Sequence, residues 1–137
     1  MYFGTNCCLR RPPCYLHPMP RRDGVFAESW LAGGYAANRP PVYSHILDRV
    51  IFPESAGQSD LALDVGCGAG MSTAALMRLE RNRVLGVDPP PAMIRAAKRH
   101  VEAASFVLGS AEALPVSSDT VGLMTAAGSL NYADIFL

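Results

Sequence analysis

The residues best suited to ligand chemistry are three closely spaced glycines in the middle of the chain. Gly66, Gly68 and Gly70 directly follow a short apolar run at 61–65, a pattern typical of a buried strand that ends in a sharp turn. Glycine lets the backbone turn tightly and approach a ligand with no side chain in between. The free N–H groups at the start of a following helix can bind an anionic group such as a carboxylate.

An acid further along the chain adds a second part to this pattern. Asp88 ends a second apolar run, at 84–87, about 20 residues after the glycines. A carboxylate in that position can accept hydrogen bonds from both hydroxyls of a ribose. The pattern therefore predicts a site for a nucleoside-containing cofactor. The alternative is a turn that needs glycines only to fold, and the acid after the second strand argues against it.

The spacing of the glycines distinguishes between nucleoside cofactors. Dinucleotide-binding turns follow Gly-x-Gly-x-x-Gly, in which the third glycine allows close packing of the helix beside the pyrophosphate. This chain instead has Gly-x-Gly-x-Gly, and Asp64 stands just before it. An acid there repels a pyrophosphate and suits a cofactor that carries an ammonium group. A nucleotide-cofactor oxidoreductase is therefore the less favoured class.

Strand and helix patterns alternate along the chain and would position these residues. Apolar runs predict strands at 61–65, 84–87, 106–108 and 121–125. Helical spacing predicts helices at 42–50, at 72–79 and after Pro89, and we expect Ser72 or Thr73 to help cap the second of these. Such alternation implies an α/β fold with a doubly wound, mainly parallel sheet covered on both faces. Ligands of such sheets bind at the carboxyl ends of the strands.

Length and composition limit the classes of protein that fit. The 137 residues suffice for one domain, and half of them are hydrophobic, so we expect a folded, soluble chain. The formal net charge is zero, which disfavours nucleic acid as a partner. No apolar run approaches the roughly 20 residues that span a bilayer, so no membrane association is expected and the cytoplasm is the default location.

The first 24 residues differ in composition from the rest of the chain. They are rich in proline and arginine and have no hydrophobic periodicity, so we expect 1–24 to be a disordered leader. Cys7, Cys8, Cys14 and His17 lie within it. Because no Cys-x-x-Cys pair supports a zinc site, we expect no metal.

The motifs, taken in order, resemble those of the class I S-adenosylmethionine-dependent methyltransferases, particularly the type 11 branch that acts on small molecules. The resemblance implies a Rossmann-like fold that binds S-adenosyl-L-methionine. By this resemblance, residues at the glycine turn surround the methionine part, Asp88 holds the ribose, and the segments after the second and third strands line the adenine. The cofactor-binding residues that follow from the resemblance are Asp64, Gly66, Cys67, Gly68, Asp88, Pro89, Met93, Ser110, Ala111 and Glu112.

The same resemblance sets expectations for the domain as a whole. Family sheets have the order 3-2-1-4-5-7-6, so 61–137 corresponds to the N-terminal part of the domain, truncated after the fourth strand, and 25–60 to a helical lead-in. The fourth strand would then have an open edge with apolar Leu123 and Met124, which favours self-association. Ser110 stands where the family commonly has an aspartate.

The resemblance implies methyl transfer to a small-molecule acceptor. The alternative is a truncated, non-catalytic fragment that only binds the cofactor. No catalytic residue is assigned, since holding two reactants in line can lower the barrier without an acid or base. We expect His45 and His100 to have surface or packing roles, and we consider Asn131 and Tyr132, which follow the fourth strand, as substrate contacts.

Overall fold

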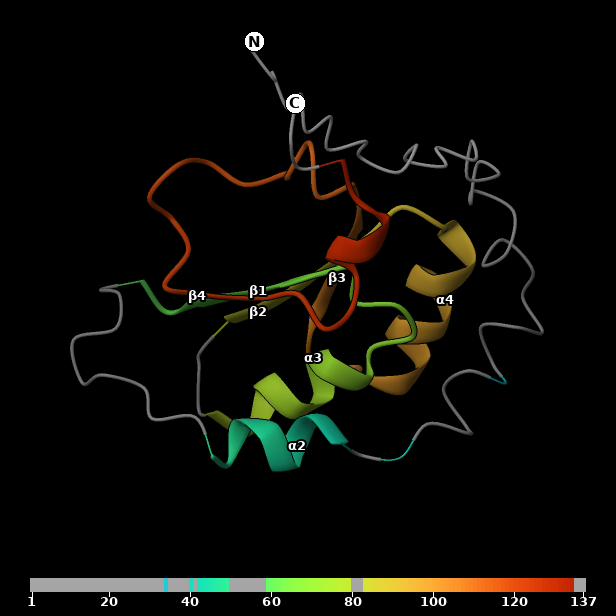
Figure 1. The fold of residues 1–137 in the computed structure, drawn as a ribbon, viewed down its shortest axis with the longest axis vertical. Helices are drawn as coiled ribbons and strands as arrows, with labels where there is room; N and C mark the ends of the chain where they lie inside the picture. Colours follow the sequence, from blue (N-terminus) through green and yellow to red (C-terminus); the bar gives the residue numbers. More distant parts are fainter. Residues whose placement is uncertain (1–33, 35–39, 41, 50–58, 80–82, 135–137) are drawn as a thin grey trace, which may run out of the picture.

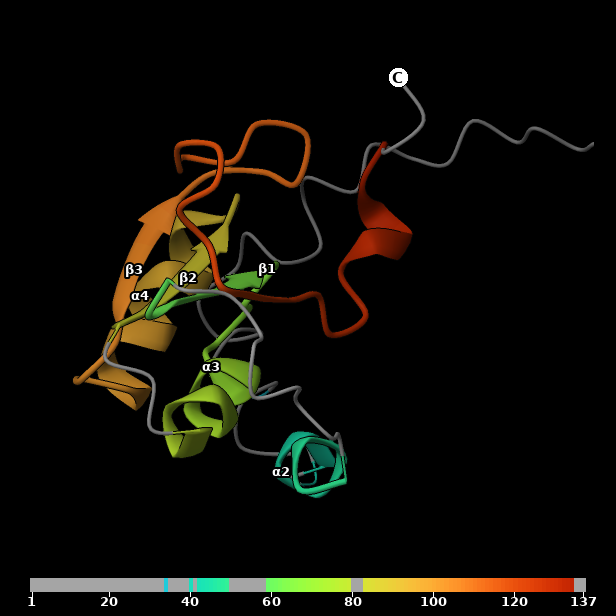
Figure 2. The same ribbon diagram turned by 90° about the vertical axis from the view of Figure 1, so that its left-hand side faces the viewer.

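The computed structural model describes residues 34, 40, 42–49, 59–79 and 83–134. Their centre is a four-stranded sheet with the order β3-β2-β1-β4, in which every pairing is parallel (Figure 1). The strands are β1 (Leu61–Val65), β2 (Arg83–Asp88), β3 (Ser105–Leu108) and β4 (Leu123–Thr125). The predicted parallel, Rossmann-like sheet is confirmed, although the helices of the described residues lie on one face (Figure 2) and β4 begins two residues later than the run at 121–125 predicted.

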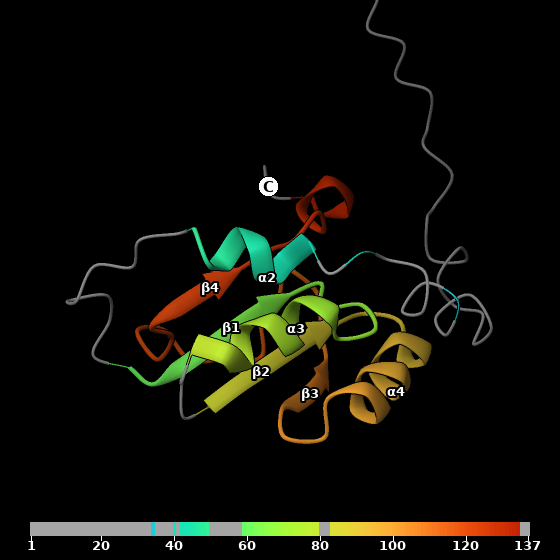
Figure 3. The same ribbon diagram turned by 90° about the horizontal axis from the view of Figure 1, so that it is seen from below.

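Helices cover one face of the sheet. They are α2 (Val42–Leu47), α3 (Met71–Leu76), which continues into a short 3-10 helix (Met77–Leu79), and α4 (Pro91–His100). Figure 2 shows α2 and α3 on one side of the strands, while the chain between β3 and β4 crosses the opposite side. From below, α2, α3 and α4 lie in a row across the sheet (Figure 3).

The alternation of side chains along β1 explains why both faces of the sheet are buried. All five residues of β1 are buried. Ala62 packs with Leu76 of α3 and Val84 of β2 on the helical face. Leu63 and Val65 point the other way and pack with Val87, beneath partly buried residues of the chain from 111 to 126. Successive residues of a strand face opposite sides of the sheet. Five buried residues in a row therefore require that other parts of the chain cover both faces of the sheet.

Local sequence sets the start and the end of α4. Pro91 occupies its first turn, where the missing N–H of proline costs nothing. Lys98, Arg99 and His100 fill the last turn, where positive charge is favourable near the helix C-terminus. On the buried side, Ile94 and Ala97 pack with Phe106 of β3. The helix is thereby held against the edge of the sheet next to the end of β2.

Several expectations concern residues outside this description. The leader at 1–24, with Cys7, Cys8, Cys14 and His17, lies outside the described residues, as does most of the lead-in at 25–60. Within the described ranges, no helix is long and apolar enough to cross a membrane. In the same residues, no cluster of His, Cys, Asp and Glu could hold a metal ion.

Candidate functional site

A cavity of about 410 Å³ lies at the carboxyl ends of β1 and β2. This is the position at which open parallel sheets bind their ligands, and the volume falls within the range of small-molecule sites, about 300–1,000 Å³. Of the residues predicted from the sequence, the structure brings these to the cavity wall: Gly66, Gly68, Asp88, Pro89, Met93, Ser110, Ala111 and Glu112. Asp64 and Cys67 are not on the wall.

Two glycines of the turn have different structural tasks. Gly66 has φ +69°, and a Cβ atom there would lie 2.1 Å from the Cβ of Ser129, so only glycine lets the chain after β4 lie against the turn. Gly68 has φ +54°, and a Cβ atom there would meet nothing within 4 Å. Since Gly68 lines the cavity, that open space is available to a ligand.

Hydrogen bonds hold the glycine turn against the end of β2. The carbonyl oxygen of Val87 accepts from the N–H groups of Gly66 and Cys67, at 2.8 and 3.0 Å. One residue further on, Oδ2 of Asp88 accepts from the N–H of Gly68 at 2.8 Å. The turn after β1 and the acid after β2 therefore form one rigid unit on the cavity wall.

Asp88 is the ionisable group of this unit. Its side chain is 7% exposed, and burial raises its pKa to about 6, against the lowering effect of the Gly68 hydrogen bond and with a smaller raising effect of Asp64. Among the described residues, the Gly68 N–H is the only hydrogen-bond donor to its carboxyl group. The carboxylate is thus largely desolvated but keeps acceptor capacity for donors of a ligand in the cavity.

Asp64 lies behind the cavity wall, although the sequence suggested a ligand contact. It is fully buried, and its Oδ2 accepts from the hydroxyls of Ser72 and Thr73, each at 2.7 Å. Its Oδ1 accepts from the hydroxyl of Thr125 in β4 at 3.1 Å. Burial raises the pKa of Asp64, and the three hydroxyl donors oppose this effect. The carboxyl group therefore connects β1, α3 and β4.

The same contacts correct one prediction about α3. Ser72 and Thr73 do not cap the helix, because Gly70 holds the N-cap position and no side chain bonds there. Their hydroxyl groups point to Asp64 instead. In an N-cap a hydroxyl oxygen would accept from a backbone N–H. Here both hydroxyls instead donate to a buried carboxyl group, and hydrogen bonds to an ionised acceptor are stronger than those between neutral groups.

Cys67 also lies behind the wall. It is 4% exposed and packs with Ile94, Ala97 and Phe106 under α4. Burial, with the carboxylates of Asp88 and Asp64 nearby, raises the pKa of its thiol above the ordinary value. The thiol therefore stays protonated and acts as a small core residue.

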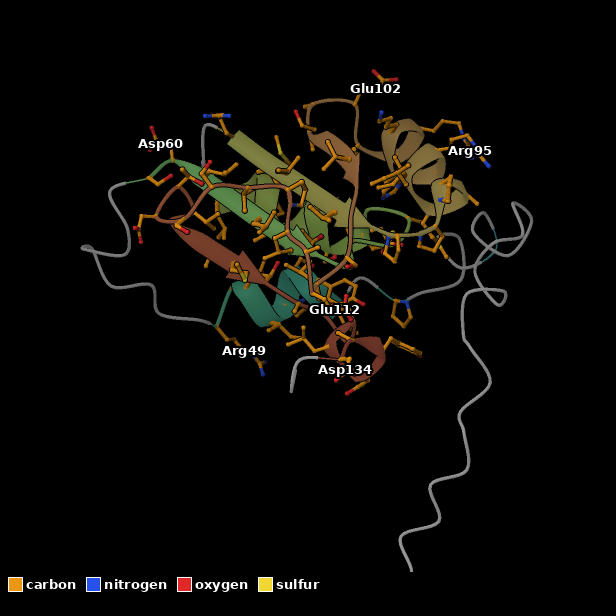
Figure 4. All side chains as sticks on the ribbon, turned by 90° about the horizontal axis from the view of Figure 1, so that it is seen from above. Arg49, Asp60, Arg95, Glu102, Glu112 and Asp134 are labelled. Carbon is orange, nitrogen blue, oxygen red and sulfur yellow. The ribbon has the colours of Figure 1, made fainter. Side chains whose placement is uncertain are left out.

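The wall opposite the glycine turn comes from the end of β3. Ser110, Ala111 and Glu112 line it, and Oε1 of Glu112 accepts the N–H of Asp134 at 2.8 Å. That bond, followed by one from the Ser110 side chain, lowers the pKa of Glu112. Figure 4 shows Glu112 and Asp134 beside each other. The bond joins the chain after β3 to the chain after β4 at the rim of the cavity.

The chain after β4 supplies wall residues that the sequence motifs indicated only weakly. Ala127, Gly128 and Ser129 line the cavity, and the Ser129 hydroxyl donates to the carbonyl oxygen of Val65. Small residues have no chemical signature, so only their position after a strand pointed to this segment. Tyr132, a substrate contact considered above, lines the cavity, whereas Asn131 does not.

The two histidines of the described chain lie away from this cavity. His45 is exposed on α2, and His100 is exposed in the last turn of α4. Neither lines the cavity. No histidine of the described residues is therefore placed to act as a base there.

Comparison with known proteins agrees with this geometry. A model of the methyltransferase domain family matches residues 62–135, more than half of the chain. An uncharacterized methyltransferase of Mycobacterium tuberculosis is 27% identical over 114 residues, which are 83% of this chain and 45% of the relative. This chain therefore spans less than half the length of that relative.

Two solved structures share the fold. A TehB-like SAM-dependent methyltransferase from Corynebacterium glutamicum aligns over 80% of this chain and 56% of its own, with 28% identity and a TM-score of 0.53. A geranyl diphosphate C-methyltransferase from Streptomyces coelicolor, solved with Mg²⁺, geranyl diphosphate and S-adenosyl-L-homocysteine, aligns over 68% of this chain and 36% of its own, with 22% identity and a TM-score of 0.56.

The parallel sheet, the glycine turn and the acid after β2 define an α/β domain with a cavity at the carboxyl ends of β1 and β2. With the family match over residues 62–135, the chain belongs to the methyltransferase domain family, and its fold is that of the class I S-adenosylmethionine-dependent methyltransferases.

Proposed function

We propose that the cavity at the ends of β1 and β2 binds S-adenosyl-L-methionine and that the chain serves methyl transfer to a small-molecule acceptor. The observation that carries this proposal is Asp88, a desolvated carboxylate on the cavity wall that Gly68 fixes in place. A ribose presents two neighbouring hydroxyl donors, which suit a carboxylate with acceptor capacity left over.

The rest of the wall fits the other parts of this cofactor. The open space beside Gly68 leaves room for the methionine part of the cofactor next to the turn. Met93 and Ala111 offer apolar surface to the adenine, and Ser110 offers a hydroxyl at its edge. In this assignment Asp64 acts from behind the wall, since it fixes the turn and the start of α3.

The cofactor supplies a methyl group that its positive sulfonium already activates. When bound, it would give this methyl group to a nucleophilic atom of the acceptor and would remain as a neutral thioether. The acceptor's proton passes to water. The chain's residues hold the two reactants close and in line, and such alignment can supply several kcal/mol of the barrier. That requirement agrees with a wall that has no histidine among the described residues.

A second candidate is cofactor binding without methyl transfer. Both candidates predict the same cofactor site, and they differ only in whether an acceptor is methylated.

Calorimetric titration with S-adenosyl-L-homocysteine tests the cofactor site. We expect saturable binding by the 137-residue chain, and we expect Asp88→Ala to weaken it by about 100-fold or more, because two hydrogen bonds to a charged group are lost. Glu102→Ala is the matched control, since this exposed acid lies beyond the C-terminal end of α4 (Figure 4). Equal affinity of the Asp88 variant and the wild type would contradict the assignment.

A further inference from the structure

One side of the rim of the cofactor cavity is formed by the segment 129–134, which we call the strap. Ser129, Tyr132 and Ala133 of the strap line the cavity. We propose that Glu112 is a positioning residue that holds the strap across the rim and thereby slows release of the bound cofactor. The inference rests on the proposed cofactor site and adds a residue that controls how long the cofactor stays bound.

Side-chain hydrogen bonds tie both ends of the strap to other parts of the domain. At the first end, the Ser129 hydroxyl donates to the carbonyl oxygen of Val65, the last residue of β1. At the second end, the N–H of Asp134 donates to Oε1 of Glu112 at 2.8 Å (Figure 4). The first bond joins the strap to the side of the glycine turn, and the second joins it to the wall that follows β3. The strap therefore spans the rim between two opposite walls of the cavity.

Burial contributes little to holding the strap between these two bonds. Its middle is a single turn of 3-10 helix, Leu130–Tyr132, in which no residue is buried. Leu130 is 42% exposed and Tyr132 is 58% exposed. Figure 2 shows this turn, drawn in red, standing away from the strands. Segments with few buried apolar contacts open locally at low free-energy cost, so the hydrogen bonds at the ends have a large share in keeping the strap closed.

The turn that carries Glu112 presents its carboxylate as an acceptor. The N–H of Ala113 donates to the carbonyl oxygen of Ser110 at 3.2 Å, which closes a tight turn around Ala111 and Glu112. The Asp134 N–H and, after it, the Ser110 side chain lower the pKa of Glu112, so its carboxyl group stays ionised. A hydrogen bond to an ionised acceptor is stronger than one between neutral groups. Glu112 thus holds the strap to the wall that contains Ser110.

Glu112 itself lines the cavity, so direct contact with the cofactor is the alternative role. Asp134 does not line the cavity, and it separates the two roles. If Glu112 acts through the strap, loss of the Asp134 N–H has the same effect as loss of the Glu112 carboxylate. If Glu112 acts by touching the cofactor, loss of that N–H has no effect.

Surface plasmon resonance measures the rate at which S-adenosyl-L-homocysteine leaves the immobilised full chain. We expect Glu112→Ala to raise this dissociation rate about tenfold, because lost contacts act mainly on dissociation. Glu112→Gln keeps an oxygen that can accept the Asp134 N–H, so its rate should stay within about threefold of the wild type. Glu112 is exposed, so both variants keep the fold. Glu102→Ala, the matched control at another exposed acid, should leave the rate unchanged.

Asp134→Pro removes the donor of the same bond from the other side. Ala133 has ψ 146°, an extended conformation that suits the residue before a proline. We expect Asp134→Pro to raise the dissociation rate about tenfold, and the double variant with Glu112→Ala to be no faster, because both changes remove one bond. Asp134→Ala keeps the N–H and should stay within about twofold of the wild type. A normal rate in Asp134→Pro, or additive effects in the double variant, would overturn the proposal.

Amide hydrogen exchange of the free chain tests the same bond without the cofactor. We expect the Asp134 N–H to exchange at least about tenfold more slowly in the wild type than in Glu112→Ala, since the bond protects it only while the strap is closed. Glu112→Gln should recover most of this protection. Equal exchange rates in the wild type and Glu112→Ala would overturn the proposal.

The two proposals fail separately. Binding of S-adenosyl-L-homocysteine with the same dissociation rate in the wild type and Glu112→Ala would overturn the role of the strap and leave the cofactor site in place. Absence of binding by a chain whose Asp134 N–H is protected would contradict the cofactor site, and with it the role of Glu112 in cofactor release.

Discussion

Two buried aspartates flank the glycine turn, and their partners give them different tasks. Asp64 receives three hydroxyl groups from the protein itself. Asp88 receives one backbone N–H and borders the cavity. Burial raises the pKa of both. The oxygens of Asp64 are occupied by donors of the protein, so this residue stabilises the fold. Asp88 keeps acceptor capacity that a ligand can use.

The raised pKa of Asp88 predicts a pH dependence of cofactor affinity. A ribose donates to the ionised carboxylate, so binding requires the charged form. The pKa of Asp88 in the free protein is about 6. The affinity for the cofactor is therefore highest well above pH 6 and falls as the pH drops through that value. Calorimetry in buffers of different ionisation enthalpy should show release of protons on binding near pH 6.

The conservative variant Asp88→Asn provides the control for this pH dependence. It keeps the shape of the side chain but removes its titration, so its weaker binding should be independent of pH between 5 and 8 to within about twofold. Unchanged wild-type affinity at pH 5 would contradict a role for the Asp88 carboxylate.

The two glycines give a matched pair of substitutions. Gly68→Ala places an L-residue in the left-handed region, which lowers the free energy of unfolding by about 1–2 kcal/mol, and it adds a methyl group in the cavity. Gly66→Ala has the same strain, and its new Cβ atom must also displace Ser129. We expect Gly66→Ala to lower the free energy of unfolding more, as measured by urea denaturation. Gly68→Ala should retain most of the stability but lose affinity for S-adenosyl-L-homocysteine, and a Gly68 variant with normal affinity would contradict the site.

At the level of single residues, most of the residues that the sequence motifs predicted line the cavity, but the motifs did not predict the direction of each side chain. Asp64 and Cys67 belong to the right motif and still point away from the cavity. For Asp64 a signal existed, because alternation along β1 places it on the helical face with Ala62 and opposite Leu63. The direction of the Cys67 side chain depends on its neighbours Gly66 and Gly68, which both have positive φ angles. These angles could not be predicted from the residue types alone.

At the scale of elements, Asp64 connects three of them, and its contribution can be measured. Thr73→Val keeps the volume of the side chain but removes one donor to the buried carboxylate. Loss of a hydrogen bond to a charged group should lower the free energy of unfolding by about 1.5–3 kcal/mol. Ser118→Ala, at an exposed position, should change it by less than about 0.5 kcal/mol. Similar values for the two variants in urea denaturation would show that the Asp64 contacts do not stabilise the fold.

The elements themselves were predictable where the sequence period was clear. The apolar runs predicted the bounds of β1 and β2 to within one residue. The parallel direction of the strands followed from the alternation of strands and helices. The start of β4 was less clear, because Gly122 breaks the apolar run and pairs with Leu61 by a single backbone hydrogen bond. The chain from 109 to 120 has no hydrophobic period. Cover on both faces of the sheet was expected, but this segment was therefore not identified as the cover of the second face.

At the scale of the whole molecule, β4 is one of the two outer strands of the sheet in the described residues. Gly122 donates its N–H to Leu61, so by alternation the N–H groups of Leu123 and Thr125 point to the open side. Met124, half exposed, adds apolar surface there. An open edge of this kind favours pairing with another strand.

We therefore predict that the chain self-associates as its concentration rises. Analytical ultracentrifugation should show an average mass that increases between tens and hundreds of micromolar. Met124→Lys should shift the distribution towards the monomer, because a charged residue on an edge strand opposes pairing. A wild-type monomer over the whole range would contradict this prediction.

The central claim is that the cavity at the ends of β1 and β2 is the cofactor site, and mapping by NMR tests it most directly. Titration of the ¹⁵N-labelled chain with S-adenosyl-L-homocysteine should shift the amide signals of Gly66, Gly68, Asp88 and Ser110 most strongly, since these residues line the cavity. Signals of His45 and Glu102, which lie outside it, should stay in place. Saturable binding with its largest shifts away from the cavity, or no binding by the folded chain, would contradict the claim.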